Sequence, residues 1–281
     1  MSDFDIHPFP REREIVVDAG YLAAGRHIIY GLLEVDVTRA REIMRKWEKE
    51  GQKLSFTAFI VASLGRATAA YPRVQAYRDW RGRLVVFHDV DVVTMIEAKA
   101  GAVAIPHIIR GANHRTVHEI SAEIRAIQAR PASSGQQNRL MAVAPRLPRF
   151  VRLFFFWAVK KNPQWFKNLQ GTTVVTSVGM FGSGGGWGIG FLPTHTLGLT
   201  VGGIVQKPGV HEGQIAVRAY LQLTLAFDHD IVDGAPAARF ARELVELLIA
   251  FAEHSRPNAS CRSWVRSVIA LATFQIMLAW S

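Results

Sequence analysis

Residues 227–235 read FDHDIVDGA, which places His229 four residues before the Asp-Gly step that begins at Asp233. Residues 220–227 are rich in strand formers, whereas residues 237–253 carry apolar side chains at helical spacing. His229 is therefore expected in a turn between a strand and a helix. Such a turn can hold an imidazole rigidly while exposing one ring nitrogen, and Asp233 can brace the turn and cap the helix. The pattern predicts a general base.

Three further segments resemble, in the same order along the chain, parts of a known family. Residues 27–38 read HIIYGLLEVDVT, residues 55–76 end in YPRVQA, and residues 174–182 read VVTSVGMFG. Together with the His-x-x-x-Asp-Gly spacing they resemble the dihydrolipoamide acyltransferases, the core components of 2-oxoacid dehydrogenase complexes, and chloramphenicol acetyltransferase, which shares their fold. The resemblance covers roughly residues 27 to 254.

The order of the predicted elements indicates the fold class. Strands and helices mix without the regular alternation of a doubly wound sheet, which favours an α+β fold with a mixed β-sheet. The resemblance implies the same class, a two-layer sandwich like that of chloramphenicol acetyltransferase, which forms homotrimers and sometimes larger cubic shells. We expect an irregular N-terminal arm over residues 1–26, the catalytic domain over residues 27–258 and an apolar tail over residues 259–281.

Acyl transfer between thiols requires a base and a donor to the oxyanion, and the resemblance assigns these roles to His229 and Ser177. A thiol has a pKa of about 8.5, so an imidazole of near-neutral pKa suits removal of its proton. The hydroxyl of Ser177 would donate to the oxyanion of the tetrahedral intermediate. No Gly-x-Ser-x-Gly motif is present, which disfavours an acyl-serine intermediate. The family places the histidine and the serine on neighbouring subunits, with substrates entering from opposite ends.

Asp233 is expected to act structurally. In the chloramphenicol-inactivating relative, an arginine near the N-terminus pairs with this aspartate and fixes the turn that presents the histidine. The corresponding candidates here are Arg11, Arg13 and Arg26, and the sequence does not choose among them.

The charge of the chain favours an anionic partner. Its formal net charge is +10 and its pI is about 10.2. No zinc-finger spacing, ribonucleoprotein motif or basic-zipper pattern accompanies the basic residues, so nucleic acid is not the expected partner. The phosphates of coenzyme A, as a substrate, explain part of the charge.

The cysteine and histidine residues argue against a metal centre and a disulfide framework. Cys261 is the only cysteine, which favours a reducing compartment, and the N-terminus lacks a secretory pattern. We therefore expect a cytoplasmic protein. His114 and His118 are four residues apart, but no third ligand accompanies them, so no metal site is predicted.

Three features differ from the multidomain acyltransferases. The chain contains no lipoylation motif, so the acyl donor is expected to be a free thioester such as acyl-CoA, or a lipoyl group carried by a separate lipoyl-bearing protein. Residues 145–167 mix aromatic and basic side chains, a composition that fits either a membrane surface or a helix that buries its apolar side. Residues 261–281 fit either a membrane anchor or a docking helix between subunits.

Two hypotheses follow from these observations. The first is an acyltransferase that moves an acyl group directly between coenzyme A and a dihydrolipoyl or other thiol acceptor, with His229, Ser177 and Asp233 at its site. The second is a scaffold subunit of the same fold that has lost its reaction and assembles a shell or docks on a 2-oxoacid dehydrogenase type of complex. The sequence identifies neither the acyl chain nor the size of the oligomer.

Overall fold

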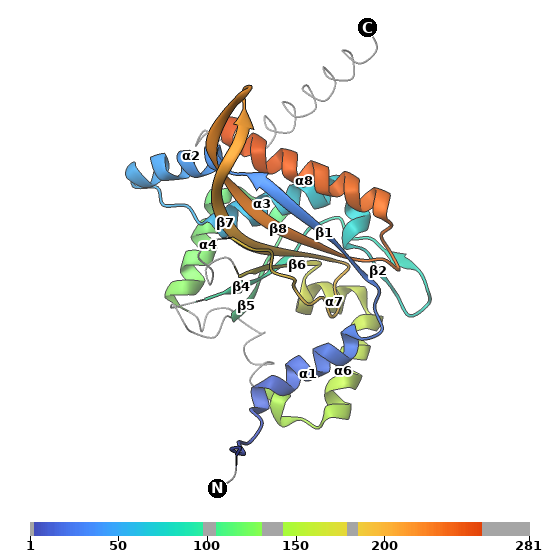
Figure 1. Ribbon diagram of the computed structural model, residues 1–281. Coiled ribbons are helices and arrows are strands. Elements are labelled where there is room, and N and C mark those ends of the chain that lie inside the picture. The colour runs from blue at the N-terminus through green and yellow to red at the C-terminus, as the bar shows by residue number, and fades with distance from the viewer. Residues whose placement is uncertain (1–2, 98–104, 131–142, 179–184, 255–281) are drawn as a thin grey trace.

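A mixed β-sheet forms the centre of the molecule. The computed structural model describes residues 3–97, 105–130, 143–178 and 185–254 (Figure 1). Within these ranges, six strands pair in the following order: β1 (Ile28–Asp36), β8 (Gln214–Asp228), β7 (Leu197–His211), β6 (Thr173–Ser177), β4 (Val92–Ile96) and β5 (Ile105–Ile109). The β4–β6 and β6–β7 pairs are parallel and the other pairs are antiparallel. The predicted α+β class with a mixed sheet is confirmed.

Strands β7 and β8 form a long ribbon whose outer half extends beyond the sheet (Figure 1). The turn between them contains Glu212 and Gly213, both at positive φ, as tight hairpin turns require. The inner half of β8 is buried and lies between β1 and β7, and its last residue, Asp228, pairs with Ile28 of β1 and donates its amide to the carbonyl of Thr196 just before β7. A separate two-stranded sheet consists of β2 (Tyr77–Arg78) and β3 (Leu84–Val85).

Four helices pack against one side of the sheet and enclose the main core: α2 (Thr38–Lys49), α3 (Phe56–Ala70), α4 (Val117–Ala129) and α8 (Gly234–His254). Helix α3 begins after Ser55, whose hydroxyl accepts from the amide of Ala58, and α4 begins with a capping box between Thr116 and Glu119. Phe59 of α3 and Phe240 of α8 are completely buried in this core. Three-residue and four-residue 3-10 helices connect other segments: η1 (Arg11–Arg13), η2 (Pro72–Gln75), η3 (Ala112–His114) and η5 (Ala144–Arg146).

The N-terminal arm differs from the irregular structure that the sequence predicts. It contains α1 (Glu14–Ala23), which packs against α6 (Arg149–Lys161), and α6 continues into α7 (Pro163–Gln170). Asp18 of α1 is completely buried and pairs with Arg152 of α6. This contact joins segments 134 residues apart, so no local pattern in residues 1–26 could reveal it. In Figure 1, α1 and α6 lie together to one side of the sheet.

The sequence left membrane association undecided for two segments, and the structure describes only one of them. Residues 145–167 form η5, α6 and α7, and none of the helices in the described part of the chain is long and apolar enough to cross a bilayer. Residues 261–281 lie outside the described residues, as does Cys261.

Candidate active site

His229 occupies the predicted turn between β8 and α8. Its amide donates to the carbonyl of His27 at 2.7 Å, which ties the turn to the start of β1. The carbonyl of Asp228 accepts from the amides of Ile231 and Val232, and Val232 is buried. The backbone of the turn is therefore held on both sides while the imidazole of His229 remains 45% exposed.

A buried ion pair fixes the end of β8 immediately before the histidine. Nε of Arg26 donates to Oδ2 of Asp228 at 3.1 Å, and Nη2 of Arg26 contacts the same oxygen. Nη1 of Arg26 donates to the carbonyl of Leu192, and Oδ1 of Asp228 accepts from the amide of Asp230. Both side chains of the pair are nearly buried. Asp228 thus orders the turn through its backbone carbonyl, its carboxylate and its partner Arg26.

The arginine partner differs from the one expected for Asp233. Arg26 was one of three candidates, but it pairs with Asp228, and among the residues with described positions no arginine forms an ion pair with Asp233. The carboxylate of Asp233 is 84% exposed and lies 3.8 Å from Nδ1 of His229. Its carbonyl accepts from the amide of Ala237 and so begins α8.

The importance of Asp228 was missed at the sequence level although it lies within the decisive motif. A signal was present: an aspartate that ends a predicted buried strand needs a cation or hydrogen-bond donors to offset its desolvation. The sequence alone could not show whether Asp228 or Asp233 pairs with the arginine. The answer depends on where the N-terminal arm crosses the turn.

The arrangement around His229 suits proton transfer. A carboxylate beside Nδ1 favours the tautomer that carries the proton on Nδ1 and leaves the lone pair on Nε2. Within the described chain, no residue forms a hydrogen bond with Nε2 of His229. A partly exposed ring whose Nε2 is not engaged in this way suits a general base.

Ser177 is the last residue of β6 and is half buried. It lies opposite Val201 of β7, and the following amide, that of Val178, donates to the carbonyl of Val201 at 2.9 Å. The hydroxyl is thus carried by a paired strand, which fixes its position relative to the sheet.

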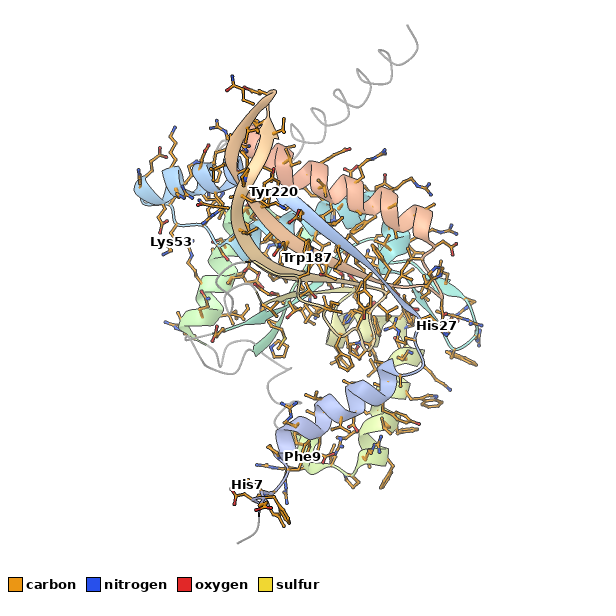
Figure 2. The ribbon with its side chains drawn as sticks, in the orientation of Figure 1. His7, Phe9, His27, Lys53, Trp187 and Tyr220 are labelled. Carbon is orange, nitrogen blue, oxygen red and sulfur yellow. The ribbon has the colours of Figure 1, made fainter. Side chains whose placement is uncertain are left out.

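The structure does not bring Ser177 and His229 of one chain together. Ser177 is level with Val201, and Val201 is level with Leu223 of β8, six residues before His229. At about 3.3 Å per strand residue, the two side chains are separated by roughly 20 Å along the strands, besides the width of two strand spacings. In Figure 2, His27, whose carbonyl accepts from the amide of His229, lies far from Tyr220, which is on the same strand as Leu223. A site that uses both residues therefore requires two copies of the chain.

A second histidine near the turn is unsuited to catalysis. His195 is buried, and this desolvation lowers its pKa to about 4. Its Nε2 lies 2.8 Å from the carbonyl of Gln170, to which it donates as a neutral imidazole. The ring thus joins the end of α7 to the loop before β7. Across the described residues, no group of three or more His, Cys, Asp and Glu side chains could hold a metal ion.

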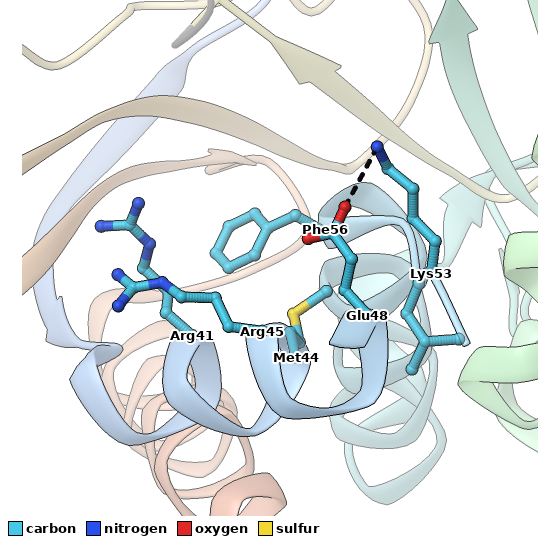
Figure 3. Close-up of a pocket in the computed structure, with 7 residues that line it drawn as sticks. Arg41, Met44, Arg45, Glu48, Lys53 and Phe56 are labelled. Atoms are coloured by element: carbon cyan, nitrogen blue, oxygen red, sulfur yellow. Dashed lines mark ion pairs between the residues drawn. The ribbon is translucent and has the colours of Figure 1, made fainter. Parts of the chain in front are cut away.

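A small basic pocket lies between α2 and the start of α3. It has a volume of about 160 Å³ and is lined by Arg41, Met44, Arg45, Glu48, Lys53, Leu54 and Phe56. Lys53 pairs with Glu48, whereas no described residue forms an ion pair with Arg41 or Arg45. The two arginines are one helical turn apart, and in Figure 3 their guanidinium groups extend to the same side, next to the ring of Phe56. The pocket therefore offers two positive charges beside an apolar surface.

The sequence and the fold are similar to those of known proteins. Residues 27–139 and 160–254 match the family described as 2-oxoacid dehydrogenases acyltransferase (catalytic domain). The lipoamide acyltransferase component of the branched-chain alpha-keto acid dehydrogenase complex of Bacillus subtilis is 26% identical over 224 residues, which are 77% of this chain and 45% of that protein. The chain thus spans less than half the length of this relative.

Two solved structures share the fold. One is the dihydrolipoamide acetyltransferase of Azotobacter vinelandii, studied for the roles of a serine, a histidine and an asparagine in its catalytic mechanism. It has a TM-score of 0.66 and 19% identity, with 89% of this chain and 94% of that chain covered. The other is the cubic core of the pyruvate dehydrogenase multienzyme complex, with a TM-score of 0.64, 19% identity and the same coverage. The family match covers well over half of the residues, and the chain therefore belongs to the 2-oxoacid dehydrogenase acyltransferases, matching their catalytic domain.

Proposed function

We propose that the protein transfers an acyl group directly between coenzyme A and a thiol acceptor of the dihydrolipoyl type. The observation that carries this proposal is the exposed imidazole of His229. Its turn is held by the buried pair of Arg26 and Asp228 and lies within the residues that the family match covers. The proposed catalytic domain spans residues 27–258. The lipoyl group would be supplied by a separate lipoyl-bearing protein or as a free dithiol.

The reaction needs one proton transfer in each direction. Nε2 of His229 removes the proton from the acceptor thiol, and the thiolate forms a C–S bond to the carbonyl carbon of the acyl-CoA. The hydroxyl of Ser177 donates to the resulting oxyanion. As this intermediate collapses, the C–S bond to coenzyme A breaks, and the leaving thiolate takes the proton from the imidazolium. Asp233, beside Nδ1, holds the ring in the orientation that presents Nε2 to the thiol.

The spacing of the three residues supports the assignment. In the Azotobacter vinelandii protein, the interval from the serine to the histidine equals that from Ser177 to His229. The interval from its histidine to its asparagine equals that from His229 to Asp233. An asparagine at the last position would keep a polar side chain beside the imidazole but would lack the charge. This difference favours an orienting role over an essential charge for Asp233.

We propose a homotrimer, or a larger assembly of trimers, as the active form. The separation of Ser177 from His229 in one chain supports a site built from two subunits. The sheet face away from the helices also exposes Tyr30 and Leu32 of β1, by 47% and 55%, as a surface awaiting a partner would. A cubic core is known for a solved protein of the same fold.

The basic pocket on α2 is proposed to bind phosphates of coenzyme A. Helix α2 begins level with β8 near Ala219, whose amide donates to the hydroxyl of Thr38. Leu223, which is level with Ser177, is four residues from Ala219 along β8, whereas His229 lies beyond the end of that strand. The start of α2 is therefore closer to Ser177 than to His229. Phosphates on Arg41 and Arg45 would then leave the thioester free to extend toward Ser177 of the same subunit and His229 of a neighbour.

The test is an assay of acyl transfer from acetyl-CoA and from branched acyl-CoA thioesters to free dihydrolipoamide, with the acylated product detected by chromatography. His229→Gln is expected to lower the rate by roughly 10²- to 10⁴-fold, the usual contribution of a general base. His211→Gln is the matched control, because His211 is half exposed at the end of the β7–β8 ribbon. Its rate should equal that of the native sequence.

The outcomes separate the two hypotheses from the sequence analysis. Equal rates for the native protein and His229→Gln with every acyl group would contradict the proposed base. A defined oligomer that neither binds acyl-CoA nor transfers its acyl group would instead establish the scaffold role.

A further inference from the structure

Helices α1 and α6 form a unit outside the residues that match the family. The match covers residues 27–139 and 160–254, so it omits α1 and all but the last two residues of α6. The two helices are joined by the buried contact between Nε of Arg152 and Oδ2 of Asp18, at 2.5 Å, and by a contact from Arg152 to Glu14 at 3.1 Å. The side chains of Arg152 and Asp18 are 5% and 0% exposed. This buried ion pair therefore holds the two helices together.

One face of α6 presents large aromatic side chains to solvent. Phe150, Phe154 and Trp157 are 74%, 64% and 52% exposed, and their spacing of four and three residues places them on one side of the helix. Lys161 follows on the same side, with its Nζ 3.5 Å from the centre of the Trp157 ring. A folded protein rarely exposes so many neighbouring aromatic groups unless the surface binds something.

Cation–π contacts extend this face at both ends. Arg149 lies over the ring of Tyr21 on α1, at 5.1 Å, and Tyr21 is 62% exposed. Lys161 also lies 5.1 Å from the ring of Trp80, which is 59% exposed, and Arg81 covers the same ring at 4.7 Å. We name this surface the aromatic–basic stripe, and it consists of Tyr21, Arg149, Phe150, Phe154, Trp157, Lys161, Trp80 and Arg81.

Helix α6, which carries most of the stripe, lies in a segment with an unusual charge distribution. Between Ile124 and His211 the sequence has ten lysines and arginines and no aspartate or glutamate. The two acidic residues of α1 are both engaged by Arg152, and one of them is completely buried. Among the cations of the stripe, Arg149 lies 3.5 Å from Asp18, whereas no described residue forms an ion pair with Lys161 or Arg81.

We propose that the aromatic–basic stripe binds the surface of an anionic lipid membrane. Exposed Phe and Trp side chains enter the boundary between headgroups and acyl chains, while Lys and Arg interact with anionic headgroups. The helix would lie on the membrane surface with this face toward the lipid. A second copy of the chain is a poorer occupant, because most of the stripe, on α1 and on α6 up to Trp157, falls outside the family match, whereas shared assembly surfaces are expected within the match.

The proposal can be tested by sedimentation of the full chain with lipid vesicles. Binding is expected to vesicles of phosphatidylcholine with phosphatidylglycerol, to weaken with added salt, and to be much weaker with phosphatidylcholine alone. The double substitution Phe154→Ser with Trp157→Ser should reduce the binding by about tenfold or more, since each removes buried apolar area in the bound state. Lys161→Glu should also reduce it.

The matched control is Val210→Ser with Ile215→Ser, which alters two side chains of the β7–β8 ribbon that are 77% and 81% exposed. This variant should bind vesicles like the native protein, and thermal unfolding should show that both double variants are folded. No binding to anionic vesicles would contradict the proposal. Native binding by the Phe154 and Trp157 variant would assign the membrane contact to another segment. A change in its oligomer mass without a change in vesicle binding would assign the stripe to a second copy of the chain.

Discussion

At the scale of single residues, the two aspartates that flank His229 have different environments. Asp228 is buried and pairs with Arg26, whereas Asp233 is largely exposed and lies beside the imidazole. The free energy that orders the turn should therefore come mainly from Asp228. Asp233 should affect only the orientation of the ring.

Asp228→Asn and Asp233→Asn test this difference. Breaking a buried ion pair typically costs about 3–5 kcal/mol, so Asp228→Asn should lower the free energy of unfolding substantially and reduce kcat by about tenfold or more. Asp233→Asn should change stability by no more than about 0.5 kcal/mol, as expected for an exposed side chain, and should change the rate less than tenfold. Urea unfolding and steady-state kinetics measure both effects. A larger loss in Asp233→Asn than in Asp228→Asn would contradict this account.

Sequence reasoning succeeded at the site where local chemistry decides the structure. The strand, turn and helix around His229 follow from side-chain periodicity. The partner of Arg26 could not be predicted, because it depends on a contact between residues 202 apart. Helix α1 was missed for the same reason, since its buried aspartate needs the distant Arg152.

At the scale of elements, α1 is attached to the molecule largely through α6. Hydrogen bonds and charge from Asp18 raise the pKa of Arg152 above its ordinary value, and its guanidinium is a buried positive charge. A buried charge that loses its partner is strongly destabilising, whereas an apolar pair of similar size can be neutral. The contact between α1 and α6 should respond to substitution accordingly.

Arg152→Met should destabilise the packing of α1 on α6 by about 3–5 kcal/mol, because it leaves the carboxylate of Asp18 buried without its closest partner. Hydrogen exchange of the α1 amides would report this change. Arg149→Met is the control, since Arg149 is 52% exposed and lies 3.5 Å from the same carboxylate, and it should cost no more than about 1 kcal/mol. The double substitution Arg152→Met with Asp18→Leu should recover most of the protection. Equal protection in all variants would exclude the ion pair as the anchor.

The basic pocket on α2 leads to a second prediction at the scale of elements. Arg41→Ala with Arg45→Ala should raise the KM for acyl-CoA by about tenfold or more with little change in kcat, because the phosphates are bound equally in the ground state and the transition state. Arg39→Ala with Lys49→Ala removes the same charge from the same helix outside the pocket and should leave KM nearly unchanged. Equal shifts in both double variants would indicate a general effect of charge and no phosphate site.

At the scale of the whole molecule, the buried His195 links stability to pH. Its pKa is lowered to about 4 from an ordinary value of 6.5, so the unfolded chain binds a proton more readily than the folded chain between these values. Stability is therefore fully present above about pH 6.5, falls as the pH is lowered, and levels off near pH 4. The total loss corresponds to roughly 3 kcal/mol.

The measurement is urea unfolding at about pH 7.5 and about pH 5. The native protein should lose about 2 kcal/mol from this histidine over that range. His195→Gln keeps a donor for the carbonyl of Gln170 but cannot be protonated, so its loss over the same range should be smaller by that amount. Parallel losses in the two proteins would show that His195 does not control the pH dependence.

The pattern of side chains along the sequence could not reveal how subunits are arranged around the site, because this pattern reflects the structure of a single chain. The resemblance supplied the expectation of a shared site, and strand register supports it by placing Ser177 and His229 far apart in one chain. The central claim is that each site combines His229 of one subunit with Ser177 of another.

Subunit complementation tests this claim most directly. Ser177→Ala and His229→Gln chains, with different affinity tags, would be expressed together, purified through both tags and assayed for acyl transfer beside each variant alone. In a mixed trimer, about one site in three would combine an intact His229 with an intact Ser177, so we predict about one third of the native rate from two nearly inactive parents. A mixed assembly no more active than the average of its parents would contradict the shared site.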